Sequence, residues 1–297
     1  MKLVWDKTGE KEYETGVDHG VLYPFDANNN SYEKGVAWNG LTSVQATPSG
    51  GEANPFYADN IKYLNLYSLE ENGATIEAYM SPKEFDECDG TVEVEGTKGL
   101  KAKAQSRKTF GFTWRSLVGN DVDENAGYVL HILYGCKASP SERQYQTVND
   151  SPEPITLSWE ITTIAPEMPV EGLKNTALFE ITSTDFVTDG EKEMLSALED
   201  KLYGTANTDP ELPTIEELIG LLSGTSYKIT WKAGDFILRE SSVPSGSYPV
   251  YSGSVPSQTG KQFIGWNTSD DASTAIDIPV ASANATYYAV YTEVTNG

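Results

Sequence analysis

The stretch Lys108-Thr-Phe-Gly-Phe-Thr-Trp114 alternates large aromatic side chains with small or polar ones. The same alternation returns in Ile155-Thr-Leu-Ser-Trp-Glu-Ile161, whereas Tyr128-Val-Leu-His-Ile-Leu-Tyr134 between them is apolar on both sides. Alternation of period two predicts half-buried strands, and a continuous apolar run predicts a strand covered on both faces. These runs therefore predict the centre of an antiparallel sheet with one apolar face. The opposite face is small, polar and nearly free of basic residues.

Composition bounds the class of protein. The chain has 297 residues and 38% hydrophobic residues, enough for one large domain or two ordinary ones. Its net charge of −23 predicts a surface that repels nucleic acid and anionic membranes. Simple solubility explains such a charge, and so does a surface that must face a polyanion without binding it. We also expect no membrane partner, because no apolar run approaches the length of a transmembrane helix.

Shorter signals place further elements around the central sheet. Strands are predicted at 21–25, 38–44, 61–69, 75–80 and 178–182. Glu71-Asn-Gly73 predicts a hairpin between 61–69 and 75–80, because Asn-Gly suits a type I′ turn. The Pro- and Gly-rich segment 47–55 is expected to be a long loop, and 1–20 to be a terminal arm.

A change of composition divides the chain into two predicted domains, 1–224 and 225–297. Helices are expected at 191–203 and 213–222, and 223–226 is the expected boundary. Residues 225–297 carry four basic and six acidic residues, so almost all of the negative charge lies before them. Strands predicted in this second part are 227–231, 236–239 and 287–291. The fold class is therefore mainly β with a flanking α-helix, followed by a small all-β domain.

The sequence holds no recognisable catalytic or metal-binding pattern, so we expect no enzyme and no cofactor. His19 lies in a polar stretch, and His131 lies in the most apolar strand without a neighbouring nucleophile pattern. Cys88 and Cys136 lack zinc spacing, and we expect free thiols in a chain made in the cytoplasm. The segment 26–37 begins like a calcium loop but lacks its glycine and its final glutamate. A convergent acidic pair of a carbohydrate-active enzyme stays open as an alternative.

The segment 98–108 is the one basic cluster in the sequence. It is either a solvated loop or a partner for acidic surface on a neighbouring copy of the chain. It is too short, in too acidic a chain, to predict nucleic-acid binding.

Eight stretches occur together, in order, across most of residues 1–224. They are Tyr13-Glu-Thr-Gly-Val-Asp-His-Gly-Val-Leu-Tyr-Pro24, Gly35-Val-Ala-Trp-Asn-Gly-Leu-Thr42, Tyr57-Ala-Asp-Asn-Ile-Lys-Tyr-Leu64, Ile76-Glu-Ala-Tyr79, Arg107-Lys-Thr-Phe-Gly111, Leu133-Tyr-Gly-Cys136, Thr147-Val-Asn-Asp-Ser-Pro152 and Ala197-Leu-Glu-Asp-Lys-Leu-Tyr-Gly204. Jointly they resemble the major tail protein, or tail tube protein, of long-tailed siphophages of Gram-positive hosts. The resemblance implies a β-sandwich or barrel whose copies form hexameric rings. The rings stack into a tube that conducts the genome at infection.

This resemblance implies a location and partners. The protein is expected in the phage tail of the virion, assembled in the host cytoplasm. Its expected partners are its own copies and the tape measure, tail terminator and distal tail proteins. DNA is expected to pass through the lumen without specific binding, because a wall of hydroxyls and carboxylates repels a polyanion.

Two sets of candidate residues follow. The expected lumen-facing residues are Glu77, Thr109, Thr113, Thr156, Ser158 and Glu160. The expected ring-to-ring contacts lie in the arm, in the 45–60 loop and in the 137–151 loop, at Trp5, Pro48, Gly50, Gly51, Pro55, Arg143 and Tyr145.

The second part of the chain carries Gly260-Lys-Gln-Phe-Ile-Gly-Trp-Asn267 and Tyr287-Tyr-Ala-Val-Tyr-Thr292. These stretches resemble the Listeria–Bacteroides repeat of bacterial surface proteins. The resemblance implies a β-grasp-like module on the outside of the tube, where it either contacts host surface glycans or only decorates. The alternative function is a secreted or surface β-rich adhesin or carbohydrate-binding protein.

Overall fold

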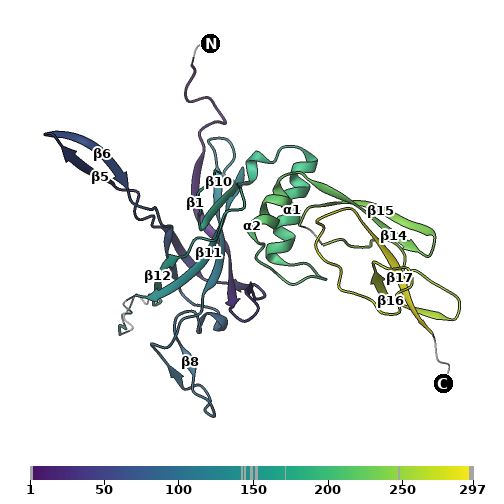
Figure 1. Ribbon diagram of the computed structural model, residues 1–297. Coiled ribbons are helices and arrows are strands. Elements are labelled where there is room, and N and C mark those ends of the chain that lie inside the picture. The colour runs from purple at the N-terminus through teal and green to yellow at the C-terminus, as the bar shows by residue number, and fades with distance from the viewer. Residues whose placement is uncertain are drawn as a thin grey trace. The chain divides into compact units, whose positions relative to one another are not determined.

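The computed structural model describes residues 3–141, 143, 145–147, 150, 153–170, 172–246 and 248–293. It is 42% strand and 10% helical, which confirms a mainly β protein with flanking helices (Figure 1). The chain forms two compact units, Met1–Asp185 with Tyr203–Leu212, and Phe186–Leu202 with Pro213–Gly297.

The described part of the first unit is built on a nine-stranded antiparallel sheet. The strand order is β2-β1-β10-β11-β12-β7-β4, with β13 also paired to β11 and β3 to β1. The bounds are β1 Tyr13–Asp26, β2 Ser31–Tyr32, β3 Val36–Trp38, β4 Leu41–Ala46, β7 Gly73–Ala78, β10 Phe110–Gly119, β11 Gly127–Pro140, β12 Leu157–Thr163 and β13 Leu178–Thr182. The three strands predicted to lie at the centre are β10, β11 and β12, and that prediction is confirmed.

An aromatic core packs against one face of this sheet. The Trp38 ring lies 4.5 Å from the Phe85 ring and 5.5 Å from those of Phe112 and Trp159, measured between ring centroids. Phe85 comes from a short 3-10 turn, η1 (Lys83–Phe85), and is fully buried. Edge-to-face and tilted contacts between aromatic rings stabilise a core beyond the effect of the area that they bury. Strands β3, β10 and β12 therefore all contribute aromatic side chains to one core cluster.

The region 41–78 is one long antiparallel arm and corrects two predictions. Strand β5 (Ala53–Ala58) pairs with β6 (Ile61–Tyr67), whereas β7 pairs with β4 and β12. The hairpin turn is therefore at Asp59 and Asn60, not at Asn72–Gly73. Of the predicted loop 47–55, residues 53–55 belong to β5, whereas residues 47–52 lie outside the named strands. Asp59 and Asn60 have φ of 50° and 64°, the left-handed pair that a type I′ turn requires.

Backbone hydrogen bonds hold the stem between the two strand pairs. Ser49 and Glu71 exchange N–H···O bonds of 2.9 and 2.8 Å. Gly50 has φ +81°, and a Cβ at this position would lie 1.9 Å from the Leu69 carbonyl oxygen. The stem needs glycine there for its close backbone approach. Gly50, which we predicted to contact the next ring, is therefore also required by the backbone of the stem.

The terminal arm is shorter than expected. Strand β1 begins at Tyr13, which is the register partner of Gly119 in β10. The Gly9 N–H also donates to Asp121 Oδ1 at 2.8 Å. Of the predicted arm 1–20, residues 13–20 therefore belong to the sheet.

The basic cluster faces acidic residues of its own chain. Strands β8 (Val92–Glu93) and β9 (Lys101–Ala102) form a small hairpin. Lys101 pairs with Asp86, and Lys108 Nζ lies 3.3 Å from Glu87 Oε2. Carboxylates of the first unit thus neutralise much of the positive charge of the basic segment 98–108.

The second unit combines two helices with a four-stranded sheet. Helices α1 (Asp189–Tyr203) and α2 (Ile215–Leu222) confirm both predicted helices, and Thr214 caps α2 in a capping box with Glu217. The strand order is β15-β14-β17-β16, with bounds β14 Ser226–Ala233, β15 Phe236–Pro244, β16 Lys261–Asn267 and β17 Ala285–Glu293.

The helices group with the C-terminal sheet. Lys201 of α1 lies 3.3 Å from Glu217 of α2 and stacks over the Tyr248 ring at 5.1 Å. The sequence places both helices in 1–224, and the functional boundary at 223–226 stays a prediction. None of the helices in the described part of the chain is long and apolar enough to cross a membrane.

Candidate assembly surfaces

A polar surface covers the open face of β4, β7, β12 and the end of β11. Cross-strand register places Ser43, Glu77 and Ser158 in one row, and Gln45, Thr75, Glu160 and Ser139 in the next. Ser43 Oγ donates to Glu77 Oε2 at 2.9 Å. The opposite face of the same strands is the buried core, because side chains alternate along a strand. Three lumen candidates, Glu77, Ser158 and Glu160, therefore share one polar face.

The other three lumen candidates lie elsewhere. Thr156 is exposed just before β12, and Thr109 is half-buried just before β10, where its carbonyl accepts from the Phe25 N–H at 2.9 Å. Thr113 is fully buried, so its prediction as a lumen residue was wrong. Alternation along a strand predicts which side chains share a face, but not whether that face is exposed to solvent.

The β5–β6 hairpin exposes apolar side chains on both of its faces. Phe56, Leu64 and Leu66 lie on one face, and Tyr63 and Tyr67 on the other, as strand alternation requires. Their side chains are 40–71% exposed, and every residue of both strands is exposed. Figure 1 draws β5 and β6 away from the other strands of the first unit. An isolated two-stranded hairpin is marginal in water, so this element needs a further surface to pack against.

The ring-contact candidates fall in three places. Pro48, Gly50 and Gly51 lie in the stem of the long arm, and Pro55 lies in β5. Trp5 is 74% exposed, next to the exposed side chains of Leu3 and Val4.

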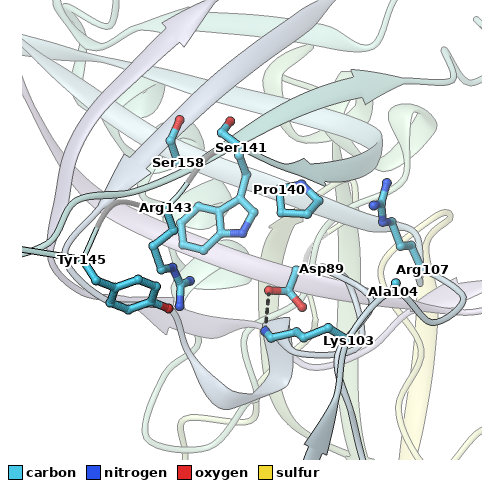
Figure 2. A pocket seen from close by; sticks show the side chains of 10 residues that line it. Asp89, Lys103, Ala104, Arg107, Pro140, Ser141, Arg143, Tyr145 and Ser158 are labelled. Atoms are coloured by element: carbon cyan, nitrogen blue, oxygen red, sulfur yellow. Dashed lines mark ion pairs between the residues drawn. The ribbon is translucent and has the colours of Figure 1, made fainter.

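Arg143 and Tyr145 instead border a pocket in the first unit. Its volume is about 340 Å³, and Figure 2 shows Arg143 and Tyr145 at one side, Arg107 at the other, and the Lys103–Asp89 ion pair between them. Ser158, a lumen candidate, lines the same pocket. Thus two sets of residues that the sequence assigned to different surfaces meet here. Of the predicted loop 137–151, residues 137–140 belong to β11, so the loop begins later than predicted, and residues 142, 144, 148, 149 and 151 lie outside the described residues.

A hydrogen-bonded chain of polar side chains joins β1, β10 and β11, and no sequence pattern predicted it. His131 stacks on Trp114 with a ring distance of 4.7 Å, and its Nε2 lies 2.9 Å from Ser116 Oγ. Ser116 Oγ donates to Glu14 Oε2 at 2.9 Å, and His131 Nδ1 lies 3.3 Å from Glu180 Oε1 without a hydrogen bond. The cross-strand neighbours of His131 follow from the register of β11 with β10 and β13, which a single sequence does not give.

This arrangement resembles a serine triad only in its residue types. A carboxylate can only accept, so the single Ser116 proton goes to Glu14. Ser116 then accepts from His131, whose Nε2 must carry the proton and cannot act as the base for Ser116. Ser116 also lies within an extended strand and not on the sharp turn of a nucleophile elbow. The chain is a structural tie between β1 and β11.

His131 predicts a pH dependence of folding. Burial lowers its pKa below the usual 6.5, although the charges of Glu180 and Glu14 oppose the shift. The unfolded chain therefore takes up a proton first as pH falls below 6.5, and folding stability falls with it. We expect the first unit to lose stability between pH 7 and 5.5, because the unfolded imidazole takes up its proton over this range while burial disfavours the charged form in the folded chain.

Denaturant unfolding at the two pH values measures this loss. His131→Gln, whose amide can still donate to Ser116, should remove most of it. His19→Gln is the matched control, because the His19 side chain is half exposed. An equal pH dependence in wild type and His131→Gln would contradict the assignment.

The two cysteines are free and buried in the core. Burial raises the pKa of Cys88 to about 12 and raises that of Cys136 well above its usual value. Such thiols are unreactive at neutral pH. The described residues also hold no group of three or more His, Cys, Asp or Glu side chains that could bind a metal ion.

Compared with known protein families and with curated proteins, the chain matches none.

Proposed function

We propose that this protein is a structural subunit that polymerises with its own copies into the tail tube of a long-tailed phage. The observation that carries the proposal is the β5–β6 hairpin, an extended element with apolar side chains on both faces and no core of its own. The sequence resemblance supplies the hexameric ring and the stacking of rings into a conduit for DNA.

The shape of the hairpin favours contacts between identical copies. A hairpin that is apolar on both faces is stable when it is covered on both, as strands in a buried sheet are. One hairpin inserted between neighbouring copies would satisfy this requirement in a head-to-tail arrangement. Head-to-tail contacts close into rings or continue as helical stacks, and a tube contains both.

The polar face of β4, β7 and β12 suits the wall of a DNA conduit. Glu77 and Glu160 place carboxylates on it, and Ser43 and Thr75 add hydroxyls. Duplex DNA carries about one negative charge per 1.7 Å, so carboxylates lower its affinity for the wall. In this proposal the polar face lines the lumen, and the four-stranded sheet of the second unit lies outside the tube as a surface module. Contact of that module with host glycans remains part of the proposal.

Electron microscopy of the purified protein tests the proposal. We expect hollow tubes or six-fold rings in negative stain, with large particles in light scattering. Monodisperse monomers at every protein concentration would contradict self-assembly and favour the adhesin alternative. Filaments with a solid centre would contradict the conduit. A sugar-release assay on the same sample tests the carbohydrate-active alternative, and we expect no release.

A further inference from the structure

The pocket between η1 and the end of β11 concentrates positive charge in a strongly acidic chain. Lys103, Arg107 and Arg143 line it with a single carboxylate, Asp89, which gives the lining a net charge of +2. The whole chain has a net charge of −23. The lining of this pocket therefore has the opposite sign to the net charge of the chain.

Two of the cations are held in place by their neighbours. Lys103 Nζ lies 3.6 Å from Asp89 Oδ2, and Arg107 Nη1 donates to Ser139 Oγ at 3.1 Å. The Arg107 stem also packs against Gly90, where a Cβ would lie 3.3 Å from Arg107 Cγ. Arg107 donates one of its five guanidinium N–H groups to Ser139, so other N–H groups can donate to a ligand.

The third cation has no such partner. Among the described residues, Arg143 forms no ion pair or hydrogen bond, and it lies beside the Tyr145 side chain (Figure 2). Serine hydroxyls at positions 141 and 158 complete the lining, and the Ser141 N–H donates to the Ser158 carbonyl at 3.1 Å. Guanidinium and hydroxyl donors around a hollow match the oxygens of a carboxylate or phosphate.

The backbone of the pocket is also unusual. Ala104, which lines it, has φ +61°, in the left-handed region that alanine rarely adopts. The Gln105 N–H donates to the Gly90 carbonyl at 2.9 Å and holds this segment against the turn after η1. An unfavourable backbone conformation of this kind persists only where the surrounding structure enforces it, and such conformations are frequent at binding sites.

We propose that this pocket is an oxyanion site that receives a carboxylate side chain of a second copy of this chain. The inference rests on the proposed self-assembly, and charge complementarity selects the occupant. A chain with 44 acidic and 21 basic residues offers many carboxylates to a pocket of charge +2. The volume of about 340 Å³ admits a glutamate or aspartate side chain with several waters.

The first arm of the test measures anion binding without requiring assembly. Citrate and inorganic phosphate are added to the full-length protein, and the unfolding midpoint is compared with sodium chloride of equal ionic strength. A ligand that binds the folded state raises the midpoint. Phosphate and citrate also stabilise folded proteins by exclusion from their surface. We therefore expect a smaller rise in Arg107→Gln/Arg143→Gln than in wild type, and the wild-type rise in Lys98→Gln/Lys174→Gln, which loses the same charge elsewhere. Equal midpoints in citrate, phosphate and chloride for wild type would overturn the site.

The second arm measures assembly by sedimentation. Charge reversal in Arg107→Glu/Arg143→Glu should raise the concentration needed for polymerisation about tenfold, because 1.4 kcal/mol per contact corresponds to a factor of ten. Lys98→Glu/Lys174→Glu should polymerise as wild type. If the reversed variant binds no anion but polymerises normally, the pocket takes only a free anion and the second-copy occupant is overturned. If wild type itself fails to polymerise, the proposed function fails, while the anion arm still decides the site.

Discussion

Phe56→Ser/Leu64→Ser/Leu66→Ser yields a folded protein that does not polymerise. All three side chains lie on one face of the β5–β6 hairpin and are 40–56% exposed, so they contribute little to the folded chain by itself. Burying one such side chain stabilises a contact by about 1.5–3 kcal/mol. These side chains are already about half covered in the single chain, so losing three weakens each contact by roughly half of the summed value, about 2–4 kcal/mol, or about 30- to 1000-fold in affinity.

Sedimentation and negative-stain microscopy measure this loss, and circular dichroism with the unfolding midpoint verifies the fold. The control is Val122→Ser/Ile164→Ser/Val187→Ser, which removes three apolar side chains outside the hairpin that are even more exposed, at 68–71%. Normal tubes from the hairpin variant would contradict the proposal that the β5–β6 hairpin joins neighbouring copies. Loss of polymerisation in the control as well would show that general surface apolarity, and not the hairpin, drives assembly.

We expect tubes of Glu77→Lys/Glu160→Lys to retain duplex DNA and wild-type tubes to release it. Each copy exchanges two carboxylates for two ammonium groups on the polar face, so a six-fold ring gains twelve cations. Six to ten phosphate contacts change affinity by about 10³–10⁵ between 50 and 200 mM salt. We therefore expect DNA to sediment with the variant at low salt and to be released as salt rises.

Co-sedimentation of a labelled duplex with preassembled tubes measures this binding. Glu124→Lys/Glu193→Lys makes the same charge change at exposed positions off the polar face and serves as the control. Equal DNA retention by both variants would show that charge alone, and not a lumenal position, determines binding. Variant tubes that bind no DNA at low salt would place the polar face away from the channel.

Several elements could be read from the sequence because their signals are local. The alternation in Phe110–Gly119 and Leu157–Thr163, and the apolar run in Gly127–Pro140, mark the central strands. Both helices carry their own start signals, and Thr214 with Glu217 forms the capping box of α2. Such patterns arise from the 3.6- and 2-residue periods of the backbone, which do not depend on distant residues.

Pairing was harder to predict than strand position. Asn72–Gly73 is the stronger turn sequence, yet the chain turns at Asp59 and Asn60, where both residues adopt positive φ. Tertiary pairing decided the outcome, because β7 forms ladders with β4 and β12 on its two edges. A strand flanked on both sides cannot also form a tight hairpin with β6.

The sequence by itself determined a β-rich, acidic protein, the residues that share each strand face, and the two helices. Only the tertiary structure decided that Thr113 is covered while Ser158 and Glu160 are open. It also brought Asp89, Arg107 and Arg143 to one pocket. The physical reason is that side-chain alternation follows from local backbone geometry, whereas burial and clustering depend on which distant segments pack together.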